Sequence, residues 1–191
     1  RAQVTIFGAT TKSSGLQGTR SPFLTPLLKD NQRNSSEYYK KIREMRKHPT
    51  VKLTRGLSIA VMAQSPWSIH AEPDAPEGAK EFAEKVLLPL QDEYMNVALR
   101  GTFDFGWQPF EKVFAFDMHT GNIVINKLKP LLQDQTDIVI KADTGEYAGV
   151  MQFQLYLEPV NVMLVSTNVE GTYFYGEGSM SAIETAYNCW R

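Results

Sequence analysis

Residues 101–128 read GTFDFGWQPFEKVFAFDMHTGNIVINKL. Up to Gly101 the apolar residues recur at helical spacing, and beyond it they alternate with polar residues, which is typical of half-buried strands. The alternating runs 108–116 and 123–128 flank a turn at 117–121 that contains Asp and Gly. We therefore expect a β-hairpin at the centre of the chain, with helices before it.

The same alternation continues toward the C-terminus. Runs 137–141 and 147–156 flank ADTGE, whose Asp and Gly supply turn chemistry, so they predict a second hairpin. Residues 163–166 predict one more strand. Residues 176–179 form a Gly-rich loop that leads into a helix through Ile183, Tyr187 and Trp190, with Ser179 as its expected cap.

On the N-terminal side the spacing predicts helices. One begins near Asp74 with an acidic first turn, is kinked or divided at Pro89, and ends at Gly101. Residues 67–71 alternate and predict a strand that carries His70 on its surface. Residues 49–64, with Val51, Leu53, Leu57, Ala60 and Val61 at helical spacing, predict a buried helix.

The segment before these helices has a different composition. Residues 35–47 offer N-cap serines and good helix formers, and so predict one more helix. Residues 8–36 are rich in Gly, Ser, Thr, Asn and Pro without apolar periodicity. The sequence thus predicts an extended arm over 1–36 and one domain over 37–191. Its fold class is α+β: an N-terminal arm and helices, then antiparallel β-hairpins and a C-terminal helix.

Composition narrows the function classes. With 20 Lys and Arg against 21 Asp and Glu among 191 residues, the net charge is -1, so any DNA contact must come from a local patch or an assembled oligomer. The single cysteine, Cys189, forms no internal disulfide, which favours a reducing compartment. The longest apolar stretch, 57–63, is too short to span a bilayer, and no signal-like run opens the chain. Since it starts at Arg1 and stops within a helical run, we expect a piece of a longer protein.

One basic cluster is a candidate contact site. It comprises Lys40, Lys41, Arg43, Arg46 and Lys47 on the helix expected over 35–47. These side chains could contact DNA phosphates or an acidic partner. The alternative is a solvated helix face, which is what most charge runs are.

The residues favour no catalytic centre, cofactor or metal. The chain has no phosphate-binding loop, and GEGS at 176–179 lacks the second glycine of a hydrolase nucleophile elbow. Asp117 and His119 could form a metal or acid–base pair, but turn chemistry explains them better because no third ligand follows. The aromatic residues Trp107, Phe110, Phe114 and Phe116 are interpreted as core rather than as a base-stacking platform.

Several segments, taken in order, resemble the portal proteins of tailed bacteriophages, especially the Mu-like portals. They are RKHP at 46–49 followed by an apolar helix and PWSI at 66–69, then DFGWQPFEKVF at 104–114, KLKPL at 127–131 and YGEGSM at 175–180. The resemblance covers about residues 44–191. Each motif alone is only moderately specific, but their order is hard to obtain by chance. Residues 1–43 add nothing to it.

The resemblance implies a structural protein and not an enzyme. It would be the wing part of a portal subunit, in a dodecameric ring at the portal vertex of the virion capsid, assembled in the host cytoplasm. Its implied partners are further copies of itself, the major capsid protein, a head–tail connector or adaptor, the terminase large subunit and double-stranded DNA in the channel, with no membrane. Its implied roles are viral genome packaging and ejection.

Two alternatives stay open. One is a hydrolase or nucleic-acid-processing enzyme that uses Asp117 and His119 or Ser179, and the other is a generic interaction domain. For the arm, the low apolar content of residues 8–36 predicts that they order only against an adjacent subunit or a capsid protein. Unchanged ring assembly and capsid incorporation after their deletion would contradict that hypothesis.

Overall fold

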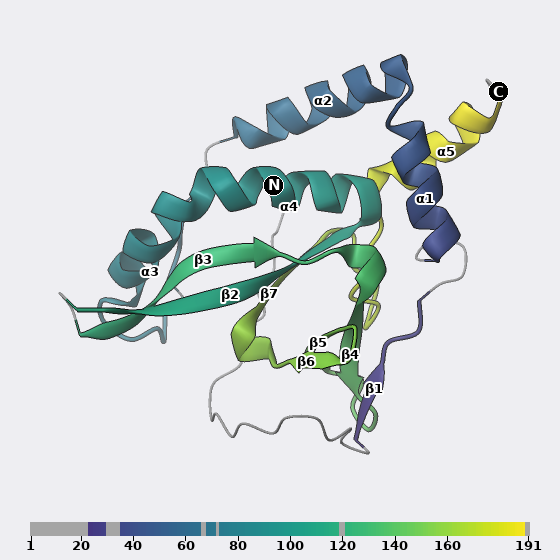
Figure 1. Cartoon of the computed structure of the whole chain (residues 1–191). Coiled ribbons are helices and arrows are strands. Elements are labelled where there is room, and N and C mark those ends of the chain that lie inside the picture. Colours follow the sequence, from purple (N-terminus) through teal and green to yellow (C-terminus); the bar gives the residue numbers. More distant parts are fainter. Residues whose placement is uncertain (1–22, 30–34, 66–67, 72, 119–120, 190–191) are drawn as a thin grey trace.

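A computed structural model describes residues 23–29, 35–65, 68–71, 73–118 and 121–189, and confirms the α+β class (Figure 1). The helices are α1 (Ser36–Met45), α2 (Pro49–Ala63), α3 (Ala79–Leu87), α4 (Gln91–Phe105) and α5 (Ser179–Cys189), with short 3-10 turns at Leu88–Leu90, Gln133–Gln135 and Pro159–Asn161. The strands are β1 (Leu24–Pro26), β2 (Trp107–Asp117), β3 (Asn122–Pro130), β4 (Thr136–Lys141), β5 (Tyr147–Gln152), β6 (Leu155–Leu157) and β7 (Val162–Ser166).

The strands form two antiparallel sheets. One has the order β3-β2-β7 and the other the order β1-β4-β5-β6. The hairpin expected around residues 117–121 is confirmed as β2 and β3, which also contain a bulge next to Val113 and Phe114. The second hairpin is confirmed as β4 and β5. The run 147–156 is two strands rather than one, because Phe153 takes a positive φ of 57° and turns the chain back.

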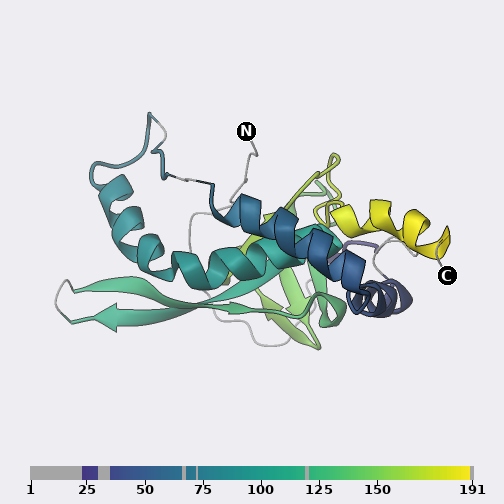
Figure 2. The same ribbon diagram turned by 90° about the horizontal axis from the view of Figure 1, so that it is seen from above.

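Helix α4 covers one face of the β3-β2-β7 sheet (Figures 1 and 2). The contact buries Tyr94 and Ala98 of the helix against Phe110, Leu128 and Met163 of the three strands. Removing these side chains from water is the main stabilisation of this layer.

The larger core lies where α1, α5, the end of α4 and both sheets meet. Its fully buried side chains include Tyr39, Ile42, Trp107, Tyr175 and Met180. Helix α1 has its side-chain cap at Ser35, as the serine pair predicts: the Oγ accepts a hydrogen bond from the Tyr38 amide at 3.1 Å. The buried residues of α1, which are Tyr38, Tyr39, Ile42 and Met45, therefore lie on one side of the helix and pack into this core.

The predicted end of α4 is wrong by one turn. The helix passes through Gly101 and stops at Gly106, whose φ of 88° provides the left-handed cap. Gly101 serves a different purpose: Gln108 and Gln133 pack so close to its α carbon that no β carbon would fit there. A glycine required for close packing has the same sequence signature as a glycine required for a cap.

Three further predictions need correction. Residues 68–71 are irregular rather than a strand, and exposed His70 lies there; Trp67 is outside the described residues. Helix α3 begins at Ala79, later than expected. Helix α2 is not buried as a whole, since only Val51 and Ile59 are.

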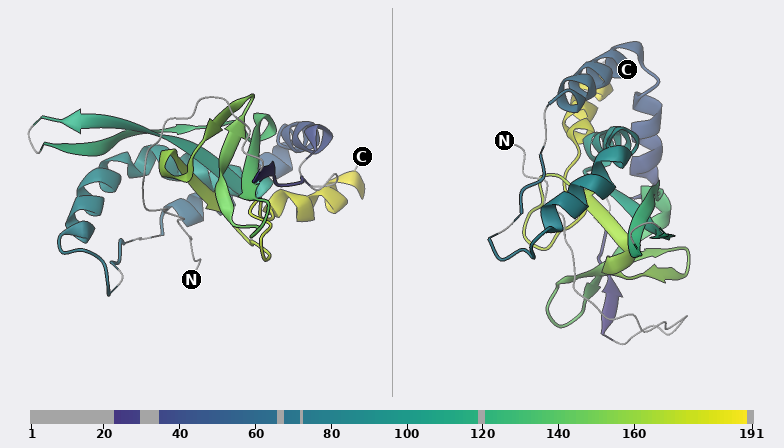
Figure 3. Two further views of the ribbon diagram at one scale, coloured as in Figure 1. Left: turned by 90° about the horizontal axis from the view of Figure 1, so that it is seen from below. Right: turned by 90° about the vertical axis from the view of Figure 1, so that its left-hand side faces the viewer.

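The part of the arm that the structure describes, residues 23–29, contributes a strand to the four-stranded sheet. Residues 24–26 pair with β4 as strand β1, and the amide of Leu27 donates to the carbonyl of Ile138 at 2.7 Å. Figure 3 shows β1 at the edge of this sheet. Residues 24–29 therefore contact the body of their own chain.

Candidate association surfaces

Three of the motifs that carry the sequence resemblance meet at one junction. The α carbon of Gly178 lies so close to the backbones of Asp104 and Gly106 that no β carbon would fit. Thr167 joins the two segments, since its amide donates to the Gly106 carbonyl at 2.9 Å and its carbonyl accepts from the Glu177 amide at 3.0 Å. The segments DFGW and YGEGS thus pack directly against each other.

Asp104 is the charged centre of this junction. Its carboxylate is only 1% exposed and accepts hydrogen bonds from Arg46 at 2.8 Å and from Arg55 at 2.6 and 2.8 Å. The Arg55 pair is bidentate, which is the strongest geometry for a guanidinium and a carboxylate. The three residues come from the end of α1, from α2 and from α4, so the network fixes these helices relative to one another.

Buried tyrosines join the junction to the sheet. The Tyr175 hydroxyl accepts from the Ile138 amide at 3.1 Å and donates to the Leu27 carbonyl at 3.2 Å. The Tyr39 hydroxyl accepts from the Trp107 indole at 3.3 Å. Burial raises the pKa of Tyr39, of Tyr147 and of Tyr175 above the usual value of a phenol, so these three hydroxyl groups are neutral near pH 7.

Most residues of the basic cluster, which lies on α1 and in the two residues after it, form ion pairs within the chain. Lys41 pairs with Glu184 of α5, Arg43 with Asp134 at 2.8 Å, Arg46 with Asp104, and Lys47 with Glu44 at 2.6 Å. Lys40 is exposed. Four of the five cations thus have carboxylate partners, so the cluster offers less charge to DNA than its sequence indicates.

The candidate catalytic residues are not brought together by the described structure. Asp117 ends β2, His119 lies outside the described residues, and Ser179 is exposed at the first residue of α5. Gly176, with a φ of 64°, makes the tight connection that its sequence predicts. In the described part of the chain, no three His, Cys, Asp or Glu side chains are grouped as metal ligands would be.

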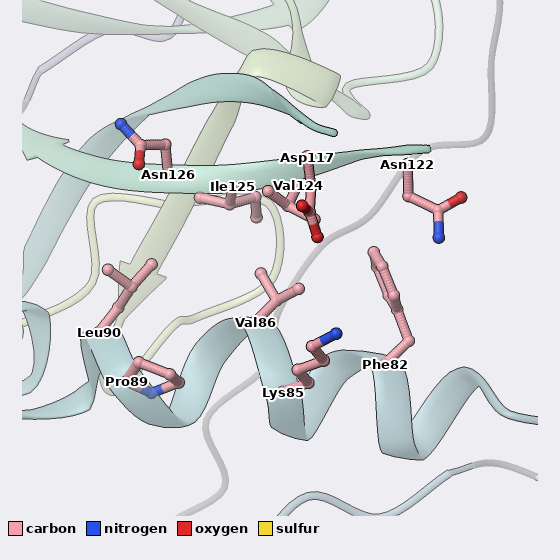
Figure 4. A pocket seen from close by; sticks show the side chains of 10 residues that line it. All are labelled: Phe82, Lys85, Val86, Pro89, Leu90, Asp117, Asn122, Val124, Ile125 and Asn126. Carbon is pink, nitrogen blue, oxygen red and sulfur yellow. The ribbon is translucent and has the colours of Figure 1, made fainter. Parts of the chain in front are cut away.

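A cavity of about 300 Å³ lies between α3 and the far end of the β2–β3 hairpin. Figure 4 shows Phe82, Val86 and Lys85 of α3 pointing toward Val124 and Asn122 of β3. Lys85 and Asp117 point into an open gap that is otherwise lined mainly by apolar side chains. This arrangement resembles loosely packed helix–sheet contact more than a set of convergent catalytic groups.

The aromatic residues of β2 divide into two groups. Trp107 and Phe110 are core, as expected, but Phe114 and Phe116 are 42% and 64% exposed, so that part of the interpretation is wrong. Phe116 pairs with Ile123, which lies between Asn122 and Val124 and therefore points away from α3. Phe114, Phe116 and Ile123 form an apolar patch that we call the hairpin face.

Helix α2 carries a second exposed apolar patch. Val51, Arg55 and Ile59 recur every fourth residue on the side that packs toward α4. Leu53, Leu57 and Val61 recur on the opposite side and are 64%, 61% and 71% exposed. We call these three the α2 stripe. Their helical spacing predicts that Leu53, Leu57 and Val61 are buried. The sequence signal against their burial is that α2 is apolar on two opposite sides.

Exposed apolar patches of this kind mark interaction surfaces in folded proteins. Helix α2 is apolar on two opposite sides, and only the side with Val51 and Ile59 is covered. Full burial of one such leucine or valine contributes about 1.5–3 kcal/mol. The α2 stripe and the hairpin face are therefore the candidate association surfaces of the chain.

None of the helices in the described part of the chain combines the length and the hydropathy that a membrane span requires.

No protein-family model matches the chain, and no curated protein matches it either.

Proposed function

We propose that the chain is the wing part of a tailed-phage portal subunit, a structural protein that self-associates into a ring around a DNA channel at the capsid vertex. The observation that carries the proposal is the ordered set of segments from RKHP to YGEGS. Three of them contribute to one junction, through Arg46, Asp104 and Gly178. Segments that pack against one another must have compatible sequences. Finding all of them in one chain is therefore more informative than finding any one of them.

The two exposed apolar surfaces support self-association. The α2 stripe and the hairpin face are on different elements, as the head-to-tail contacts of a ring require. Further proposed contacts are with the major capsid protein, the head–tail connector or adaptor, the terminase large subunit and channel DNA. In this proposal the chain itself catalyses no reaction.

Negative-stain imaging of the protein expressed from its complete reading frame tests the proposal. We expect rings with a central channel, and a mass by native mass spectrometry that is a whole multiple of the subunit. A protein that stays monomeric at every concentration, or that turns over a phosphoester or ester substrate with loss of turnover in Asp117→Asn or Ser179→Ala, would contradict it and favour the enzyme alternative.

A further inference from the structure

Helix α3 is packed more loosely than the other four helices. None of its residues, all of which the structure describes, is buried, whereas α1, α2, α4 and α5 each contain at least one buried side chain. Phe82 points toward the hairpin (Figure 4) and is still 45% exposed. The cavity of about 300 Å³ separates the helix from β3. Because buried apolar surface is what fixes a helix in place, little free energy holds α3 against the hairpin.

A break in the hydrogen-bond ladder separates α3 from α4. The residues on both sides of Pro89 have right-handed helical dihedral angles, so the chain is nearly one helix here. Pro89 has no amide proton to donate to the Lys85 carbonyl. The Gln91 amide donates to the Leu88 carbonyl instead, as in a 3-10 turn. Figure 2 shows α3 bent away from the axis of α4 at this point, and a 3-10 stretch within a helix often marks a hinge.

The N-terminal end of α3 is also weakly held. Gly78 precedes the helix with a φ of 79°, and no side-chain hydrogen bond caps it. In residues 68–71 and 73–78, the described chain before α3 contains no helix or strand. Irregular chain thus leads into α3 at one end, and a 3-10 turn leads out of it at the other.

We propose that α3 is a hinged flap, which opens from and closes on the end of the β2–β3 hairpin with Leu88–Leu90 as its hinge. Helix α4 is the fixed base, because Tyr94 and Ala98 are buried against the sheet. Opening would uncover Val86 and Val124, which line the cavity. The movement belongs to the single chain and does not depend on the proposed portal function.

Distances between spin labels test the movement. In a chain with Cys189→Ser, labels are attached after Glu81→Cys on α3 and Lys127→Cys on β3, where the natural side chains are all exposed. We expect two components in the distance distribution, the longer one from the open flap. The matched control joins Lys127 to exposed Arg100 of α4 and should give one narrow component. A distribution for the first pair as narrow as the control would overturn the flap.

Phe82→Ala tests what holds the flap closed. The substitution removes the apolar ring that points toward the hairpin, so it should raise the ratio of open to closed flap by about fivefold. The Arg100–Lys127 distance should stay unchanged. An unchanged ratio would contradict closure by apolar contact with the hairpin.

Pro89→Ala tests the hinge. The new amide can donate to the Lys85 carbonyl, so residues 79–105 should become one stiff helix and the two components should merge into one. Pro76→Ala, in the irregular chain before α3, is the matched control and should keep both components. Two components that persist in Pro89→Ala would overturn the assignment of the hinge.

Hydrogen exchange distinguishes a moving helix from one that melts. The amides of residues 82–87 donate within α3, so they should exchange at least about tenfold more slowly than those of an unfolded chain even in Phe82→Ala. Exchange at the unfolded rate, together with the longer label distance, would mean that α3 unfolds and would overturn the flap.

Discussion

At the scale of single residues, Asp104 is the side chain on which the helix arrangement depends most. Its carboxylate is almost fully buried and is shared by two arginines. Asp104→Asn would leave both guanidinium groups without a counter-charge in a partly buried place, which typically costs about 3–5 kcal/mol. Urea unfolding followed by circular dichroism should show this loss.

The matched control for Asp104 is Glu44, whose ion pair with Lys47 is exposed. Glu44→Gln should change the free energy of unfolding by less than about 1 kcal/mol. Equal effects of the two substitutions would mean that the Asp104 network does not hold α1, α2 and α4 together.

The buried phenols predict an alkaline limit of stability. Burial raises the pKa of Tyr39 and Tyr175 in the folded chain, so the unfolded chain loses these protons first as the pH rises. Their contribution is complete below a pH of about 10, the usual phenol pKa, and is lost above it at about 1.4 kcal/mol per pH unit for each tyrosine. Unfolding free energies measured between about pH 8 and pH 11 should fall this way, and Tyr39→Phe should make the fall shallower. An unchanged slope in Tyr39→Phe would contradict the assignment.

At the scale of elements, two glycines on helices should respond oppositely to alanine. Gly56 lies inside α2 with open space around it, so Gly56→Ala should stabilise the chain by about 0.5–1 kcal/mol. Gly106 caps α4 at a positive φ and its α carbon touches the backbone of Gly176 and Glu177, so Gly106→Ala should destabilise it by about 2 kcal/mol or more. Thermal unfolding of both variants checks the signs. A stabilising Gly106→Ala would mean that the junction is more open than described.

At the scale of the whole molecule, the two faces of α2 predict different phenotypes for the same kind of substitution. Leu57→Glu places a charge on the exposed stripe, and should abolish association while leaving the unfolding free energy within about 0.5 kcal/mol. Val51→Glu places it on the buried face, and should unfold the chain. Sedimentation and thermal unfolding distinguish the two outcomes. Normal assembly of Leu57→Glu would show that the stripe is not an interface.

The sequence by itself determined the α+β class, the central β-hairpin and the capped start of α1. These features depend on local spacing, on turn residues such as Gly121 and on the cap Ser35, all of which act within a few neighbouring residues. The sequence also limited the catalytic candidates, because the residue types needed for a phosphate loop or a nucleophile elbow are missing from their required positions.

Only the tertiary structure decided which apolar residues of α2 are covered and where α4 ends. It also decided that four of the five residues of the basic cluster have carboxylate partners. Leu53 and Val51 have the same local pattern, and they differ only because α4 packs on one side of α2. Gly101 lies inside α4 at a place where Gln108 of β2 and the more distant Gln133 leave no room for a β carbon. Burial and ion pairing depend on contacts between distant segments, and local spacing carries no information about which segments will meet.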